Sequence, residues 1–129
     1  MMNLLFSFQG RLNRAKWWLI NIGVIVVETI VFAILFGGTA MMADPDQAMA
    51  AMSGVNAVIA VIVFVIVLWI TISIGVRRFH DRNKSGWWVL IALVPVIGGL
   101  WYLIECGFLR GTIGPNRFGQ DPLRPRAIA

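Results

Sequence analysis

The chain has 129 residues, of which 59% are hydrophobic and only 13% are charged, with a formal net charge of +5 at pH 7. A soluble domain of this length carries about a quarter charged residues, so the composition excludes an ordinary water-soluble protein. Lipid must solvate the surplus apolar surface, and helices satisfy their backbone hydrogen bonds within one spanning segment. We therefore predict an all-α, polytopic membrane protein.

Three apolar segments approach the ~20 residues that a helix needs to cross a ~30 Å hydrocarbon layer. They cover approximately residues 17–37, 55–76 and 86–109. We predict a single membrane domain, residues 1–129, built as a small bundle of three transmembrane helices. Pro95 and Gly98 interrupt the third segment, which predicts a kinked span or, alternatively, a re-entrant hairpin that returns the tail to its side of origin.

Two acidic residues lie inside the predicted spans. Glu28 is near the middle of the first span, where a charge costs at least ~2.5 kcal/mol, and Glu105 lies in the third. Glu28 shares a helix stripe with Arg14 and Asn21 at intervals of seven residues. The alternatives are a polar seam between helices and a proton or ion relay. We favour the seam, because no intramembrane base accompanies the acids.

The loop of residues 39–54 contains no basic residue and is predicted to lie outside the cell. Asp44 and Pro45 have the pattern of a helix N-cap followed by a first-turn proline. A short interfacial helix is expected from there to about Met52. The loop methionines suggest a Cu(I) site, but no histidine or cysteine supports it, so we predict no metal site.

The basic residues fall into three groups that predict the topology. Arg11, Arg14 and Lys16 precede the first span; Arg77, Arg78, Arg82 and Lys84 lie in the loop 77–85; Arg110, Arg117, Arg124 and Arg126 lie in the tail 110–129. The positive-inside rule favours a cytoplasmic N-terminus and a cytoplasmic loop 77–85, and it leaves the side of the tail open. Tryptophan pairs 17–18 and 87–88 follow two of these groups and are expected to anchor the chain at the lipid interface.

The loop 77–85 includes the only histidine, His80, next to Asp81. Neighbouring residues on a helix point apart, and no second histidine or nucleophile completes a catalytic set, so we predict no enzyme. Asp81 is expected to form a structural ion pair with Arg77 and Arg78, which lie four and three residues earlier. Ser85 is the expected N-cap of the third segment.

The tail contains glycines and prolines that exclude a long helix. Asn116 and Asp121 are expected to close side-chain turns, and Phe118 to hold the tail against the bundle. A further hypothesis places Asp121 against the basic cluster of residues 77–84, which requires both to lie on one side of the membrane.

A set of motifs resembles the DUF805 family of small bacterial inner-membrane proteins. The resemblance rests on Phe8, Gly10, Arg11, Arg14 and Trp18; on Arg77, Arg78, Phe79, His80, Asp81, Ser85, Gly86, Trp87 and Trp88; on Pro95 and Gly98; and on Gly111, Gly114, Asn116, Arg117, Phe118, Gly119, Asp121 and Pro122. It implies a multi-pass protein of the bacterial inner membrane. It implies no substrate, cofactor or catalytic residue, because the family has no established biochemical activity.

Two functions are compatible with these patterns. The first is a non-enzymatic module that binds anionic phospholipid, or a partner membrane protein, through its basic interfacial side. The predicted contacts are Arg11, Arg14, Arg77, Arg78, Arg82 and Lys84. The alternative is a small transporter or channel subunit, assembled from several copies, that uses Glu28 and the polar stripes. Nucleic acid is rejected as a partner because the charges lie at membrane boundaries.

Overall fold

The computed structural model describes residues 5–124, apart from the side chain of Ala40. Residues 125–129, which end the predicted tail and include Arg126, lie outside the described residues. Every regular element in the described part is a helix, and Asn116 and Gly119 form an isolated bridge. The chain divides into two compact units. Unit 2 is Asn21–Trp69, and unit 1 comprises the residues before and after it.

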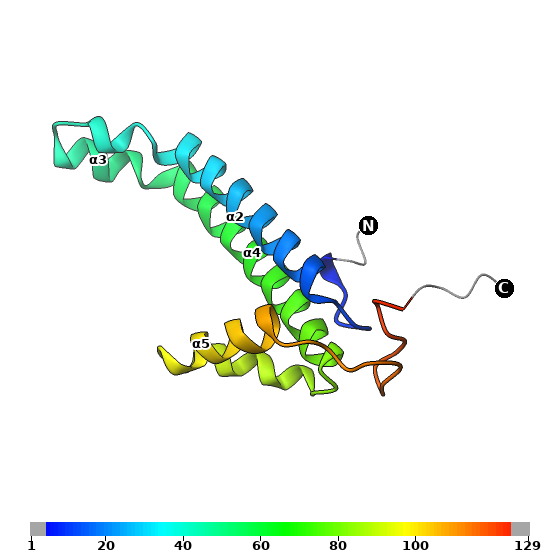
Figure 1. Cartoon of the computed structure of the whole chain (residues 1–129). Coiled ribbons are helices and arrows are strands. Elements are labelled where there is room, and N and C mark those ends of the chain that lie inside the picture. Colours follow the sequence, from blue (N-terminus) through cyan, green and yellow to red (C-terminus); the bar gives the residue numbers. More distant parts are fainter. Residues whose placement is uncertain (1–4, 125–129) are drawn as a thin grey trace. The chain divides into compact units, whose positions relative to one another are not determined.

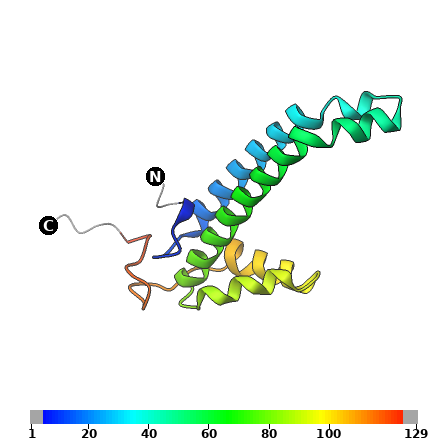
Figure 2. The ribbon, with the colours of Figure 1, turned by 180° about the vertical axis from the view of Figure 1, so that it is seen from behind.

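Two long helices, α2 (Arg14–Phe36) and α4 (Gly54–Asp81), are apolar and long enough to cross a membrane. Within unit 2 they lie side by side (Figures 1 and 2), and the Asn56 side-chain amide donates to the Leu35 carbonyl at 3.1 Å. Large aliphatic side chains on both helices are exposed, and unit 2 contains no lysine or arginine. Such a surface is suited to lipid rather than water.

The loop between these helices contains a 3₁₀ turn, η1 (Thr39–Met41), and a short helix, α3 (Pro45–Ala51). The predicted N-cap is confirmed, because the Asp44 carboxylate accepts a hydrogen bond from the Asp46 backbone N–H at 3.0 Å. Pro45 occupies the first turn, where its missing N–H removes no helical bond. That this helix lies at an interface stays a prediction.

Unit 1 brings together the start of α2, the last turns of α4 and the described C-terminal part of the chain, up to residue 124. Its buried apolar side chains come from all three regions. They are Leu12, Trp17, Ile70, Ile74, Phe79 and Cys106. Trp17 is only 3% exposed and contacts Tyr102, with ring centroids 5.9 Å apart. The expectation that Trp17 anchors the interface is therefore wrong, whereas Trp87 is 79% exposed, as an interfacial side chain requires.

The third apolar segment forms a helical hairpin, residues 86–108, rather than one long helix. A 3₁₀ helix, η2 (Gly86–Leu93), begins at Ser85, whose hydroxyl accepts from the Trp87 N–H at 3.4 Å. The chain then reverses at residues 94–96 and returns as α5 (Ile97–Leu103), followed by a π-helical turn, η3 (Ile104–Phe108). Figures 1 and 2 show η2 and α5 side by side in both views. A bundle of three long helices is thus not confirmed.

The reversal has a local cause in the sequence. η2 ends at Leu93, and Pro95 has no N–H to donate to a preceding helical turn. Val96 adopts φ 63°, a backbone conformation that L residues rarely take, and it turns the chain into α5. Gly98 then allows α5 to lie directly on η2, because a Cβ there would be 1.8 Å from the Ile91 carbonyl oxygen. The neighbouring Gly99 has open space around its Cβ position.

These two glycines test the hairpin. We expect Gly98→Ala to destabilise the protein by at least about 1–3 kcal/mol, the typical cost of overpacking. Gly99→Ala is the matched control and should be neutral or stabilising by up to about 1 kcal/mol, because alanine is the better helix former. Unfolding in mixed detergent micelles, followed by circular dichroism, measures both. Equal effects of the two substitutions would contradict the close packing of α5 on η2.

Candidate functional site

The polar centre of unit 1 is an ion-paired cluster of Arg11, Arg78 and Asp81, called here the buried triad. Asp81 occupies the last turn of α4, with Arg78 one turn earlier on the same face. One carboxylate oxygen accepts from Arg11 Nε at 2.9 Å, and the other from Arg78 Nη1 at 2.5 Å. All three residues are buried. Removing one partner from this buried cluster would be costly, because it would leave an uncompensated charge in the interior.

Arg11 also connects the N-terminal segment to the tail. Its guanidinium donates to the carbonyl of Gly114 at 2.6 Å and to that of Thr112 at 2.5 Å. The Thr112 N–H in turn donates to the Asp81 carbonyl at 2.7 Å. Gly111 permits this contact, since a Cβ at that position would lie 1.9 Å from an Asp81 carboxylate oxygen. The triad therefore joins three segments that are distant in sequence.

The C-terminal end of the hairpin is capped by side chains from both long helices. A helix end leaves its last carbonyls without intrahelical donors. Here five consecutive carbonyls accept from side chains: Cys106 and Leu109 from Arg78, Gly107 from Trp18, Phe108 from Arg14, and Arg110 from Arg82. Cations at this end also interact favourably with the helix dipole. The π-helical turn η3 places these carbonyls within reach of the donors.

A second charge cluster lies at the base of the hairpin and centres on Glu105. This carboxylate is buried, accepts from Arg82 Nε at 2.9 Å and pairs with Lys84 Nζ. The Lys84 ammonium also lies 4.9 Å from the ring centroid of Trp88 and 6.0 Å from that of Trp101. Arg82 and Lys84 keep 25% and 30% of their side chains exposed. Both are therefore partly accessible cations that are paired with the buried Glu105 carboxylate.

The tail packs on the end of α4 through aromatic and amide contacts. Phe118 stacks on His80, with ring centroids 3.9 Å apart and planes 6° from parallel, which confirms the predicted role of Phe118. The Asn116 amide donates to the His80 carbonyl at 2.9 Å, and its oxygen accepts from the Phe118 N–H. His80 Nδ1 lies 3.1 Å from the Gly10 carbonyl oxygen, so the ring is part of the packing between segments.

Asp121 has one of the two roles predicted for it, the closing of tail turns, and not the other, an ion pair with the basic cluster. Its carboxylate accepts from the backbone N–H groups of Gly114 and Leu123, so it closes tail turns as expected. These two bonds lower the pKa of the carboxyl. Among the described residues, Asp121 forms no ion pair with the cluster 77–84. The tail does reach that cluster, through Asn116 and through Arg117, which donates to the Asn83 carbonyl at 3.3 Å.

The predicted contact residues divide into two groups. Arg11 and Arg78 have side chains turned inward to the buried triad, so the structure gives them a structural role in place of the expected lipid contact. Arg77 is half-buried and Arg14 is exposed, with one guanidinium nitrogen donating to the Phe108 carbonyl.

Gly86 allows η2 to approach α4, since a Cβ there would be 2.6 Å from a Val76 methyl.

The two acids of the apolar segments have different surroundings. Glu105 pairs with the cations at the hairpin base, whereas Glu28 is half-buried on α2 within unit 2. No group of three histidine, cysteine or acidic residues with metal-binding geometry occurs in the described part of the chain.

The pairing of Arg11 with Asp81 and that of Glu105 with Arg82 and Lys84 were not anticipated. The spacing of Asp81 and Arg78 did indicate the contact between them, because both lie on one helix. Arg11 lies 70 residues from Asp81, and no local pattern connects such positions. The signal that remained in the sequence was a basic group ahead of the first span, which includes Arg11, together with an acid inside a basic loop.

The triad predicts a large effect of a small substitution. We expect Asp81→Asn to destabilise the protein by about 3–5 kcal/mol, because it leaves two buried guanidinium groups without their carboxylate. Asp46→Asn makes the same chemical change at an exposed site and should cost less than about 1 kcal/mol. Unfolding in mixed micelles gives both values. A cost for Asp81→Asn no larger than that of the control would show that the triad does not hold unit 1 together.

Comparison with known proteins agrees with the membrane character of the fold. The chain is 31% identical over 116 residues to inner membrane protein YhaH of Escherichia coli K12. The alignment covers 90% of this chain and 87% of YhaH. The chain is 27% identical over 118 residues to inner membrane protein YhaI and 28% identical over 141 residues to uncharacterized protein YiiR, both from the same organism. These alignments cover 90% and 91% of this chain and 86% of each relative. No solved structure matches.

A family model described as "Protein of unknown function (DUF805)" matches residues 5–120, which is nearly all of the described chain. The motif residues that suggested the resemblance fall within this range, except Asp121 and Pro122, which directly follow it. The residues of the buried triad, the Glu105 cluster and the packed part of the tail do so as well. The chain belongs to the DUF805 family.

Proposed function

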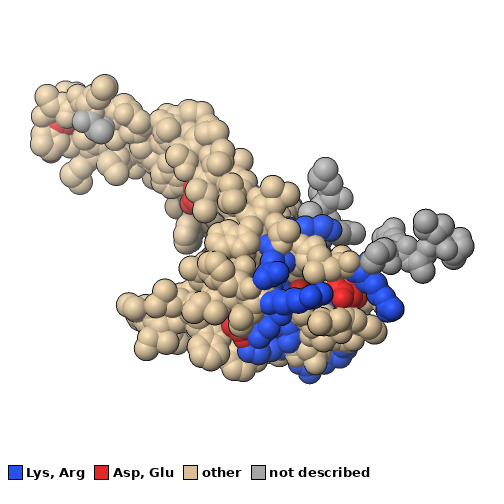
Figure 3. Space-filling view, in the orientation of Figure 1, with Lys and Arg blue, Asp and Glu red and all other residues tan. Residues whose placement is uncertain are grey.

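We propose that the protein is a two-span inner-membrane protein whose basic cytoplasmic side binds anionic phospholipid. One observation carries this proposal: the ten lysines and arginines of residues 5–124 all belong to unit 1, which contains only three acidic residues, whereas unit 2 contains three acids and no base. Figure 3 shows the blue side chains gathered around the start of α2, the end of α4 and the tail.

The packing within unit 1 supports a topology in which these charges share one side. The start of α2 and the end of α4 belong to the same compact unit, so the two helices cross in opposite directions. The tail bonds to the end of α4, through Thr112 to Asp81 and through Asn116 to His80. The tail therefore belongs on the same side as the loop 77–85, and the positive-inside rule makes that side cytoplasmic.

The dimensions of the hairpin support the same topology. Eight residues of 3₁₀ helix rise about 16 Å at ~2.0 Å per residue. The twelve returning residues rise about 18 Å if they follow α-helical geometry. Each value is close to half of a ~30 Å hydrocarbon layer. The hairpin is thus long enough to enter one leaflet and return, and too short to cross both.

The surface available to lipid consists of the cations outside the triad. This basic face comprises Arg14, Lys16, Arg77, Arg82, Lys84, Arg110, Arg117 and Arg124, all exposed or half-buried. Near an anionic membrane surface each such residue contributes about 1 kcal/mol of attraction. Trp87 and Trp88 are exposed at the start of the hairpin, where indole groups favour the headgroup region. The proposal assigns no role to Glu28.

The topology is tested with two single cysteines in a Cys106→Ala background. Gln47 lies in the loop between α2 and α4, and Gln120 lies in the tail; both are exposed. We expect a membrane-impermeant maleimide to label Gln47→Cys in spheroplasts, and to label Gln120→Cys only after the membrane is permeabilised. Labelling of both in intact spheroplasts would place the tail outside and contradict a hairpin confined to one leaflet.

Lipid preference is tested by quenching of tryptophan fluorescence with brominated phosphatidylglycerol against brominated phosphatidylcholine in mixed bilayers. We expect a preference for phosphatidylglycerol that weakens with salt, because the contacts are partly exposed to solvent. Replacing Lys16 and Arg124 with glutamine should reduce that preference by up to about fivefold per cation. The replacement of Gln47 by asparagine serves as a neutral control. Equal quenching by the two lipids with the unmodified protein would refute the proposed function.

A further inference from the structure

The base of the hairpin contains a cavity of about 340 Å³ lined by Arg82, Lys84, Trp101, Ile104, Glu105 and Leu109. We propose that this cavity is a specific site for one anionic phospholipid, with the phosphodiester on Arg82 and Lys84 and an acyl chain along Trp101 and Ile104. This inference rests on the proposed function and goes beyond it, from general attraction over the basic face to a single bound lipid in one place.

The polar end of the cavity retains hydrogen-bond donors. Arg82 donates its Nε–H to the Glu105 carboxylate and one Nη1 hydrogen to the Arg110 carbonyl. A guanidinium has five N–H donors and an ammonium three, so three donors of Arg82 and two of Lys84 have no partner among residues 5–124. A phosphodiester presents two charged oxygens to such an array. Arginine provides directed hydrogen bonds to phosphate oxygens, and lysine provides a point-charge contact.

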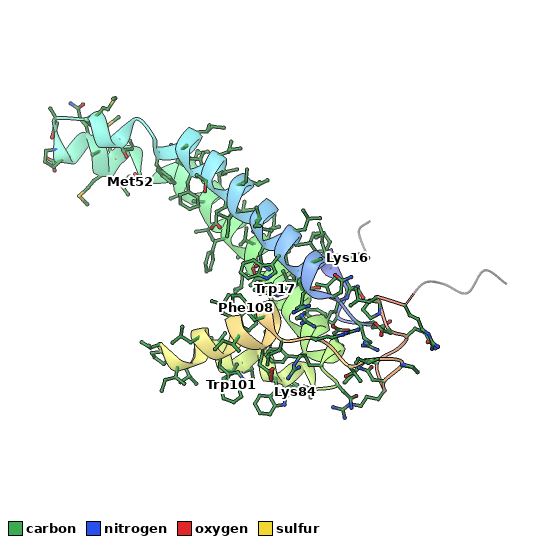
Figure 4. All side chains as sticks on the ribbon, viewed as in Figure 1. Lys16, Trp17, Met52, Lys84, Trp101 and Phe108 are labelled. Atoms are coloured by element: carbon green, nitrogen blue, oxygen red, sulfur yellow. The ribbon has the colours of Figure 1, made fainter. Side chains whose placement is uncertain are left out.

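The apolar wall explains why the ligand is a lipid rather than a soluble anion. Trp101, Ile104 and Leu109 have 45%, 50% and 39% of their surface exposed, although they lie next to two cations. An acyl chain would cover this surface, whereas a small anion would leave it bare. Figure 4 shows the labelled Lys84 and Trp101 next to each other, in agreement with the 6.0 Å between the Lys84 ammonium and the Trp101 ring centroid.

The depth of the site fits the same ligand. Arg82 and Lys84 immediately precede the hairpin, and Leu109 immediately follows it, so the cavity lies where the hairpin begins and ends. With the hairpin in one leaflet, this base is at the level of the phosphates. Trp101 and Ile104 then lie deeper, at the level of the acyl chains.

Glu105 makes the site selective. Its buried carboxylate neutralises one of the two cations, which leaves the cavity with a single net positive charge. A monoanionic phosphodiester matches that charge, and the carboxylate competes for the same donors. Removing the carboxylate should therefore strengthen binding, whereas a purely structural salt bridge would give no gain in affinity.

The site is tested by native mass spectrometry of the full chain purified in mild detergent and titrated with phosphatidylglycerol. We expect one retained lipid per protein. Arg82→Gln with Lys84→Gln should weaken its binding by about tenfold or more, on the scale of two lost surface cations. The control is Lys16→Gln with Arg124→Gln, which removes the same charge outside the cavity and should retain the lipid.

Because the double variant at the site leaves Glu105 buried without partners, a triple variant that also carries Glu105→Gln is measured beside it. The triple variant removes the whole cluster and should lose the lipid as well. Glu105→Gln alone should bind several-fold more tightly, and Trp101→Ala more weakly. Retention by the triple variant equal to that of the control would overturn the proposal.

A displacement experiment and a comparison with the quenching assay distinguish failure of the cavity proposal from failure of the proposed function. Excess glycerophosphoglycerol, the headgroup without acyl chains, should not displace the lipid, and displacement at equal concentration would assign the cavity to a soluble anion. Preference for phosphatidylglycerol in the quenching assay, without a retained lipid in the mass spectrum, would overturn the cavity and leave the proposed function intact. Loss of both would refute the proposed function itself.

Discussion

The contact on which unit 1 depends is the pairing of one carboxylate, Asp81, with two buried guanidinium groups. Arg11 brings the N-terminal segment and the tail to this point, and Arg78 brings the end of the hairpin. The cost of a buried unpaired charge makes the arrangement all-or-none, since no member is tolerated alone. The need to pair these buried charges thus fixes the positions of the N-terminal segment and of the glycine-rich tail.

This arrangement changes how the basic residues are interpreted. A cluster of cations between two apolar segments suggests a surface for lipid headgroups, yet the two most deeply placed arginines serve the fold. Arg14 and Arg82 also donate to carbonyls at the hairpin end. These bonds satisfy carbonyls that have no intrahelical donor where the hairpin ends. The remaining exposed cations form a narrower surface, on which the proposed lipid contact depends.

The third apolar segment illustrates how packing overrides length. By composition it is as good a span as the other two, but Pro95 stops one helix and Gly98 allows the next to lie against it. The returning helix then ends on donors from α2 and α4, so its carbonyls are satisfied without a continuous span. The amphipathic base that results, with Lys84 within 6.0 Å of two indole ring centroids, is a consequence of that return.

Much of the fold was predictable from local pattern. Apolar length indicated the two long helices, Asp44 and Ser85 were recognisable as N-caps, and spacing placed Asp81 against Arg78, because each depends on residues within one or two helical turns. Family membership followed from the motifs. Only the tertiary structure decided that Arg11 pairs with Asp81, that Trp17 is buried, and that Glu105 is held by Arg82 and Lys84. Those contacts join residues 21 to 70 positions apart or depend on how the helices pack, and a sequence pattern with a period of a few residues carries no information at that range.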